Sequence, residues 1–260
     1  MRTIKKVASH IFIDGFGGMT QGLFATLIIG TMIQQIGLLI GGSTGNVIYL
    51  LGKAAAALTS AGIGVGVAVK YGESPLVTVS AAVAAMVGGY AGKITGGTFF
   101  VDGNAVLAGP GEPLGAFIAA FAGITCGHLV SGKTKVDIIV TPVITIGAGS
   151  VVGLLVGPPI SQMMTGLGSI INWATEQRPF IMGIVVSVVM GMVLTLPISS
   201  AALGIILNLS GLAAGAATIG CCCNMVGFAV ASYRENKFGG LVAQGLGTSM
   251  LQLLSRPERK

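Results

Sequence analysis

The chain has 260 residues, of which 8% are charged and 53% hydrophobic, and its formal net charge at pH 7 is +6. Because about a quarter of the residues of an average soluble domain are charged, this composition excludes a soluble enzyme, a disordered chain and a disulfide-stapled secreted module. It predicts an all-α membrane protein: a polytopic helical bundle of about eight segments with one or two re-entrant elements. We treat residues 1–260 as a single transmembrane, transporter-like domain.

Apolar runs long enough to form helices recur along the chain. The run at 199–231 is too long for one straight span, so we expect it to break near Asn208–Gly211. Basic residues precede the first run and follow the last, so the positive-inside rule places both termini in the cytoplasm and makes the number of spans even. The runs fall at 15–40, 46–69, 74–92, 112–131, 137–156, 179–197, 199–231 and 240–254.

Two stretches between these runs are too polar for a spanning helix and too apolar for a solvated loop. Residues 94–111 are rich in glycine but contain Phe99 and Phe100, and residues 157–178 contain the only tryptophan, Trp173. Irregular backbone at membrane depth is tolerated only where it is buried in protein or lines a cavity. We therefore expect a re-entrant loop at 94–111 and either an interfacial helix or a hairpin at 157–178.

Glycines spaced by four residues recur within the runs. Small residues one helical turn apart let helix backbones approach closely in lipid. The spacing predicts a compact bundle and says nothing about the solute. The pairs include Gly18/Gly22, Gly62/Gly66, Gly149/Gly153 and Gly211/Gly215.

Two sequences resemble cofactor sites without the context that such sites need. Residues 127–134 match the phosphate-binding pattern G-x-x-x-x-G-K-[ST], but they end an apolar helix, whereas the motif requires a strand before it and a helix after it. The adjacent cysteines 221–223 would diverge on a helix and cannot hold one metal ion. We expect no metal, no cofactor, no catalytic residue and no nucleic-acid partner, since the basic residues form no stripe with aromatics.

Ionisable residues within the membrane region are better candidates, because they are costly there and usually mark function. Asp102 and Glu112 flank the glycines of the suspected re-entrant loop. Glu112-Pro113 also opens the next apolar run, which places the carboxylate at the positive end of a helix dipole, where capping of that helix is the competing role. His128 lies near a helix end and is equally open to an interfacial role, and Asp14 is better read as a helix cap.

A weak internal repeat adds two glutamines to the candidate ligand-binding residues. Gln21-Gly22-Leu23 near the start matches Gln244-Gly245-Leu246 near the end, and each opens an apolar run. Paired, glycine-interrupted segments point to the binding site of a transporter, although a match this short also arises by coincidence in a glycine-rich chain.

Three segments resemble a known family. FFVDGNAVLAGPGEPLGAFIAA (99–120), GGMTQGLFATLIIGTMIQQIG (17–37) and GGLVAQGLGTSMLQL (239–253) look like the type-2 IIC membrane components of the bacterial sugar phosphotransferase system, a family that includes perfringolysin-regulator-like membrane proteins. The resemblance covers nearly the whole chain. It implies a multi-pass, lipid-embedded protein of the bacterial inner membrane that forms a homodimer. Glu112-Pro113 is also similar to the Glu-Pro loop of the larger IIC superfamily, in which the glutamate binds sugar hydroxyls.

The resemblance implies a permease for a sugar or similar small polar solute. In such a permease the carboxylates of Glu112 and Asp102 would accept hydrogen bonds from ligand hydroxyls. The amide side chains of Asn104, Gln21 and Gln244 would add neutral polar contacts. The chain has no room for a phosphoryl-carrying domain, so either separate cytoplasmic phosphocarrier subunits supply the phosphoryl group or the protein works without it. An ion- or proton-coupled carrier of a small organic solute and a ligand-sensing regulator remain alternatives. The candidate ligand-binding residues are Glu112, Asp102, Asn104, Gln21, Gln244 and His128.

Overall fold

The computed structural model describes residues 14–101, 103–107, 109–194, 204, 207, 209–242 and 245. These residues are helical almost throughout, with one short β-hairpin. They divide into two compact units, of which the first ends at Met163 and the second begins at Met164.

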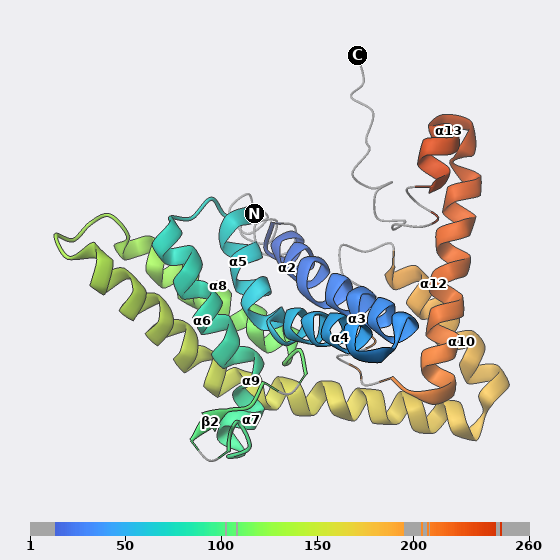
Figure 1. Ribbon diagram of the computed structural model, residues 1–260, viewed down its shortest axis with the longest axis horizontal. Coiled ribbons are helices and arrows are strands. Elements are labelled where there is room, and N and C mark those ends of the chain that lie inside the picture. The colour runs from blue at the N-terminus through green and yellow to red at the C-terminus, as the bar shows by residue number, and fades with distance from the viewer. Residues whose placement is uncertain are drawn as a thin grey trace, which may run out of the picture. The chain divides into compact units, whose positions relative to one another are not determined.

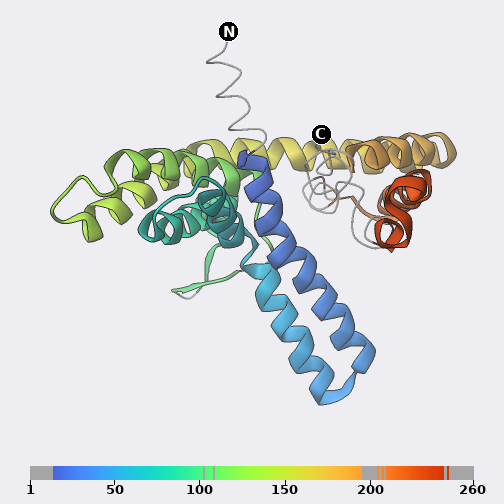
Figure 2. The same cartoon turned by 90° about the horizontal axis from the view of Figure 1, so that it is seen from above.

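The first unit opens with two long apolar helices that lie side by side (Figure 1). The first helix comprises α2 (Phe16–Leu23), the π-helical turn η2 (Phe24–Ile28) and α3 (Ile29–Ile40). The second is a bent pair, α4 (Gly42–Ala57) and α5 (Thr59–Lys70). Gly41 and Gly42 turn the chain back between α3 and α4, and both have the positive φ that glycine adopts without strain. The returning helix breaks at Leu58, where α5 departs from the axis of α4 by 53°. Figure 2 shows the α3–α4 hairpin extending away from the other helices of this unit.

A second helical pair encloses the loop that was expected to be re-entrant. The elements are α6 (Pro75–Gly89), α7 (Ala91–Thr95), β1 (Phe100–Val101), β2 (Asn104–Ala105) and α8 (Pro113–Val130). Both long helices begin with a capping side chain followed by proline, a strong start signal: Ser74 accepts a hydrogen bond from Val77 N, and Glu112 caps α8. The strands β1 and β2 pair antiparallel, with Val101 opposite Asn104.

Helix α9 (Asp137–Gln177) is the longest element, and it corrects one expectation. Residues 157–178 form neither a hairpin nor a separate interfacial helix, because the helix that begins at Asp137 continues through Pro158 and Pro159. Each proline removes one backbone donor, but helices in membranes tolerate this where neighbouring groups satisfy the freed carbonyls. The glycines and prolines of this stretch therefore did not mark a chain break.

The second unit contains α10 (Pro179–Val193), α12 (Gly211–Ala231) and α13 (Tyr233–Val242). The expected break near Asn208–Gly211 is confirmed at its C-terminal side, since α12 begins at Gly211, which has a φ of +53°. Helices α10 and α12 pack closely: a Cβ at Gly191 would lie 2.9 Å from the Gly220 carbonyl oxygen.

Glycine contacts hold the helices of the first unit together, as the spacing predicted. A Cβ at Gly18 of α2 would lie 2.6 Å from the carbonyl oxygen of Gly66 of α5, and one at Gly149 of α9 would lie 2.6 Å from that of Ala119 of α8. The prediction was wrong for Gly211 and Gly215, because no described atom lies within 4 Å of a Cβ at either position. These two glycines line an open surface.

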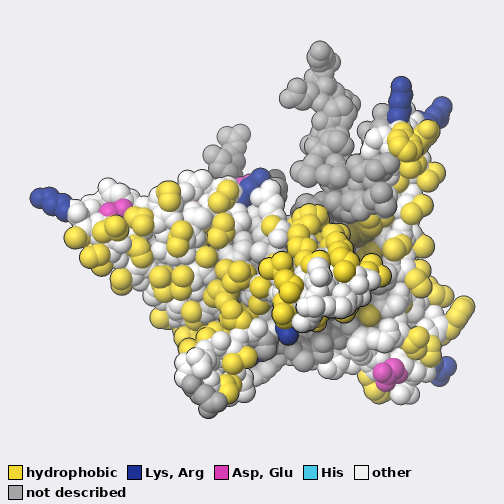
Figure 3. All heavy atoms as spheres, viewed as in Figure 1, with side chains coloured by type: hydrophobic (Ala, Val, Ile, Leu, Met, Phe, Trp, Pro, Cys, Tyr) yellow, Lys and Arg dark blue, Asp and Glu magenta, His cyan; other side chains and the backbone are white. Residues whose placement is uncertain are grey.

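Length and hydropathy support several membrane crossings. Four helical stretches are long and apolar enough to span a membrane, at 16–40, 113–130, 137–177 and 211–231, and the bent pair α4–α5 makes a fifth. Figure 3 shows hydrophobic side chains spread over the visible face, while charged side chains occur in a few small groups. The protein is therefore an all-α polytopic membrane protein. The cytoplasmic position of the termini remains a prediction, because both ends lie outside the described residues.

Candidate functional site

Three helix breaks of the first unit meet at one turn, residues 109–112, which we call the Glu112 turn. Helix α4 ends at Ala57, α6 ends at Gly89, and α8 begins after Glu112. A helix end leaves backbone groups without partners inside the helix. Such ends are tolerated at membrane depth only where protein or a cavity surrounds them, so their convergence marks this turn as a candidate binding region.

Hydrogen bonds from α5 and α6 fix the Glu112 turn in place. The Ser60 hydroxyl donates to the Pro110 carbonyl oxygen at 3.0 Å, and the Glu112 amide donates to the Gly89 carbonyl oxygen at 2.7 Å. The Tyr90 hydroxyl donates to the Gly109 carbonyl oxygen and also lies 3.2 Å from that of Ala57. Ser60 and Tyr90 are fully buried, so these bonds form in a low-dielectric environment where they are worth more than in water.

The turn also requires glycine at one position. Gly111 has a φ of +75°, and a Cβ there would lie 2.5 Å from the Ser60 hydroxyl oxygen and 3.1 Å from the Gly89 carbonyl oxygen. Both the backbone conformation and the space therefore exclude a larger residue. This contact seats the turn directly on the first turn of α5.

The Glu112 carboxylate caps helix α8. Oε1 accepts a hydrogen bond from the Leu114 amide at 3.1 Å, and Oε2 accepts one from the Gly115 amide. The carboxylate thus lies at the positive end of the helix dipole, as the sequence predicted. A carboxylate has about four lone-pair positions, so these two bonds leave acceptor capacity for a ligand.

The other candidate residues are distributed unevenly. Asn104 is exposed in strand β2, within the same loop as Glu112, and Gln21 is exposed on α2. His128 lies sixteen residues further along α8 than Glu112, or about 24 Å, and its Nδ1 pairs with Glu73 Oε1 at 2.9 Å. The structure therefore separates His128 from the Glu112 turn. Asp102 and Gln244 lie outside the described residues.

An aromatic cluster adjoins the turn. The rings of Tyr90 and Phe99 have centroids 5.3 Å apart, and those of Phe99 and Phe100 are 4.9 Å apart. Phe100 is 60% exposed, so its ring is open to contact. Aromatic rings can stack on the ring of a sugar, and the structure places Phe99 beside Tyr90, the residue that anchors Gly109, with Phe100 next to Phe99. Trp173 lies on the part of α9 that belongs to the second unit.

The sequence reasoning missed three residues. Ser60 and Tyr90, which position the turn, carried no signal, because a hydroxyl in an apolar run has no visible partner in sequence. Lys53 did carry one: it is a charged residue in the middle of the apolar run at 46–69, and it is exposed on α4. Lys53 is therefore a further ionisable residue within the membrane region.

Comparison with known protein families identifies the family of this chain. Residues 13–255 match the family described as Phosphotransferase system, EIIC. The chain belongs to this family. The comparisons with curated proteins and with solved structures gave no match.

Membership confirms the resemblance seen in the sequence. This EIIC component is a multi-pass membrane protein of the sugar-permease type, and as part of the phosphotransferase system it transports sugar together with other subunits of that system. No finding favours an ion-coupled carrier or a sensor without transport.

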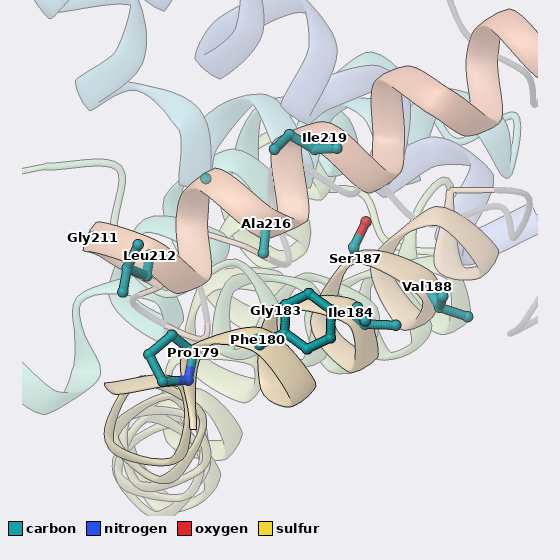
Figure 4. A pocket seen from close by; sticks show the side chains of 11 residues that line it. Pro179, Phe180, Gly183, Ile184, Ser187, Val188, Gly211, Leu212, Ala216 and Ile219 are labelled. Atoms are coloured by element: carbon teal, nitrogen blue, oxygen red, sulfur yellow. The ribbon is translucent and has the colours of Figure 1, made fainter. Parts of the chain in front are cut away.

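The EIIC component also has a hollow of about 510 Å³ in its second unit, between α10 and α12 (Figure 4). Its lining is apolar except for Ser187, and it includes Phe180, Ile184, Leu212 and Ile219. A site for a polar solute needs several convergent polar groups. The lining of this hollow therefore lacks the polar groups that a sugar site needs.

Proposed function

We propose that this EIIC component binds its sugar at the Glu112 turn and carries it across the bacterial inner membrane, while separate cytoplasmic subunits supply the phosphoryl group. The observation that supports the proposal most strongly is the convergence of three helix breaks on a turn that carries a carboxylate. Transporter sites commonly use discontinuous helices in this way, because broken helices expose dipole ends and backbone groups to a solute.

We further propose that residues 94–111 form a re-entrant element. The turn between α5 and α6 and the loop after α8 lie together, because Ser74 and Ser131 share a hydrogen bond at 3.0 Å and Glu73 pairs with His128. Helices α6 and α8 therefore leave from and return to the same side. Their other ends meet at the Glu112 turn, level with the break between α4 and α5, which lies within a candidate span.

In the proposed site Glu112 accepts hydrogen bonds from sugar hydroxyls with its remaining lone pairs. Asp102 and Asn104, from the same loop, add polar contacts, and Phe99 or Phe100 offers a ring face for stacking. Gln21 and Gln244 remain candidates from other segments. We also propose that residues 1–260 act as one transport domain and that two copies form the working unit.

The exchange Glu112→Gln tests the site, because it keeps the shape of the side chain and removes its charge. Loss of charge-assisted bonds to the sugar should weaken binding by roughly 1.5–3 kcal/mol, or about ten- to a hundredfold in Kd. The measurement is the affinity of purified protein for a sugar selected from a thermal-shift screen of hexoses, hexitols and disaccharides.

Glu73→Gln serves as the matched control, since it removes a carboxylate of the same unit at the far end of α8. It should leave the affinity unchanged. If Glu112 only caps the helix, Glu112→Gln should lower the unfolding free energy by about 1 kcal/mol and retain the wild-type affinity. That result would contradict the proposed site.

A further inference from the structure

The α3–α4 hairpin has two different faces. Glycines form the contact between the helices: a Cβ at Gly30 would lie 2.8 Å from the Gly52 carbonyl oxygen, and one at Gly37 would lie 2.7 Å from that of Gly45. These contacts fix which side of each helix faces its neighbour. The angular position of every other residue follows from the helical rotation of about 100° per residue.

The polar side chains fall on one side of that contact. Relative to Gly30, Thr31 and Gln35 are rotated by about 100° and 140° on α3. Relative to Gly45, Asn46 and Lys53 are rotated by about 100° and 80° in the same sense on α4. Because the helices are antiparallel, equal senses of rotation bring side chains to the same face of the hairpin. Thr31, Gln35, Asn46 and Lys53 therefore share one face, which we call the polar face. The exposed Leu38 and Leu50 also lie on it.

The opposite face is apolar. Ile29, Ile33 and Ile36 of α3 and Ile48 and Leu51 of α4 are rotated in the other sense. All four polar side chains of the polar face are exposed, and Lys53 has no hydrogen bond or ion pair with any residue that the structure describes. Segregation of this kind is expected where one face meets lipid and the other meets water or protein.

Lipid is a poor neighbour for the polar face. Lys53 lies eleven residues from the hairpin turn at Gly42, or about 16 Å along the helix, within a stretch that qualifies as a membrane span. The ammonium group is too deep to reach the headgroups with its own side chain. Charged residues at such depth almost always face the interior of the bundle or a water-filled cavity.

The polar face leads to the Glu112 turn. Ala57 lies one turn beyond Lys53 on the same side of α4, and its carbonyl oxygen is 3.2 Å from the Tyr90 hydroxyl, which donates to Gly109. One end of the face thus adjoins the proposed sugar site and the other adjoins the hairpin turn. We propose, on the basis of that site, that the polar face lines the water-filled solute path that leads to it, and that Lys53 gives this path a positive electrostatic potential.

The first test measures access of water along the hairpin. In a full-length variant whose four cysteines are replaced by serine, single cysteines are introduced at Gln35 on the polar face and at Ile36 and Leu51 on the apolar face. Folding is checked by size-exclusion elution, and labelling uses a charged methanethiosulfonate reagent. Gln35→Cys should react at least about tenfold faster than Ile36→Cys and Leu51→Cys, because only a hydrated, ionised thiolate attacks such a reagent and displaces its sulfinate group.

Two outcomes would overturn the proposal. Equal reaction rates on the two faces would mean that no aqueous path follows the polar face. Efficient disulfide formation between two copies at Gln35→Cys would assign the face to a homodimer contact instead.

The second test isolates the charge of Lys53. A cysteine at Ala57, four residues along the helix, has its Cβ about 5–6 Å from that of Lys53. A positive charge at this distance in water should speed an anionic thiosulfonate and slow a cationic one by about threefold each. Lys53→Gln should therefore lower the ratio of anionic to cationic rates by about tenfold.

Lys70→Gln, at the far end of α5, is the control and should leave the ratio unchanged. An unchanged ratio in Lys53→Gln would overturn the role of Lys53. Neither test involves Glu112, so a failure here is separate from a failure of the proposed sugar site.

Discussion

At the scale of single residues, the Glu112 turn depends on hydroxyl groups that sequence patterns do not reveal. Ser60 and Tyr90 are buried and donate to carbonyl oxygens of the turn. A buried carbonyl that loses its donor retains the cost of desolvation. The position of Glu112 is therefore set by its neighbours as much as by the Gly-Pro-Gly-Glu-Pro sequence itself.

Tyr90→Phe should destabilise the protein, because it removes the donor to Gly109 and the hydroxyl near the Ala57 carbonyl while it preserves the ring. We expect a loss of about 1–3 kcal/mol in unfolding free energy, measured as a lower Tm in detergent. Tyr49→Phe is the control, since the Tyr49 hydroxyl forms no hydrogen bond with any residue that the structure describes. Equal Tm values for Tyr90→Phe and the wild type would show that the turn does not depend on this hydroxyl.

At the scale of elements, the apolar runs predicted which segments are helical, and Glu112-Pro113 predicted where one helix begins, since it opens α8. Ser74-Pro75 opens α6 in the same way. The stretch at 157–178 misled the prediction, because proline breaks a helix in water more strictly than it does within a packed membrane protein. The break at Leu58 left no sequence signal, since neither glycine nor proline stands there and the bend arises where α5 meets the Glu112 turn.

Glycine packing gives a prediction at this scale. Gly149→Leu should lower the unfolding free energy by about 1–3 kcal/mol or more, because a Cβ there would lie 2.6 Å from both the Ala119 carbonyl oxygen and the Ala84 Cβ. Gly215→Leu is the matched control, since it adds the same side chain to open space. Thermal unfolding in detergent should separate the two variants. Equal destabilisation of both would mean that the α8–α9 contact is looser than described.

At the scale of the whole molecule, the family and the class of fold were within reach of the sequence, while the assembly of the site was not. Composition indicated a polytopic membrane protein, and the residues around Glu112 carried the family resemblance that residues 13–255 confirm. Which candidates meet in space depended on tertiary contacts. His128 shares a helix with Glu112, yet it lies at the opposite end and pairs with Glu73.

Membrane topology follows from the proposed cytoplasmic termini. The α3–α4 turn should face the outside, and the loop after α8 should face the cytoplasm, on the same side as the α5–α6 turn. A single cysteine at Ser43 should then react with an impermeant thiol reagent only from outside, and one at Lys133 only from the cytoplasm. Right-side-out and inverted vesicles distinguish the two cases. Labelling of Ser43→Cys from the cytoplasm alone would reverse the orientation of the hairpin and of the solute path.

A structure of this EIIC component with its sugar bound tests the central claim most directly. We predict that the sugar lies at the Glu112 turn, with at least one hydroxyl within hydrogen-bond distance of a Glu112 carboxylate oxygen, and with its ring beside Phe99 or Phe100. A sugar bound in the second unit, or bound in the first unit without contact to Glu112, would contradict it.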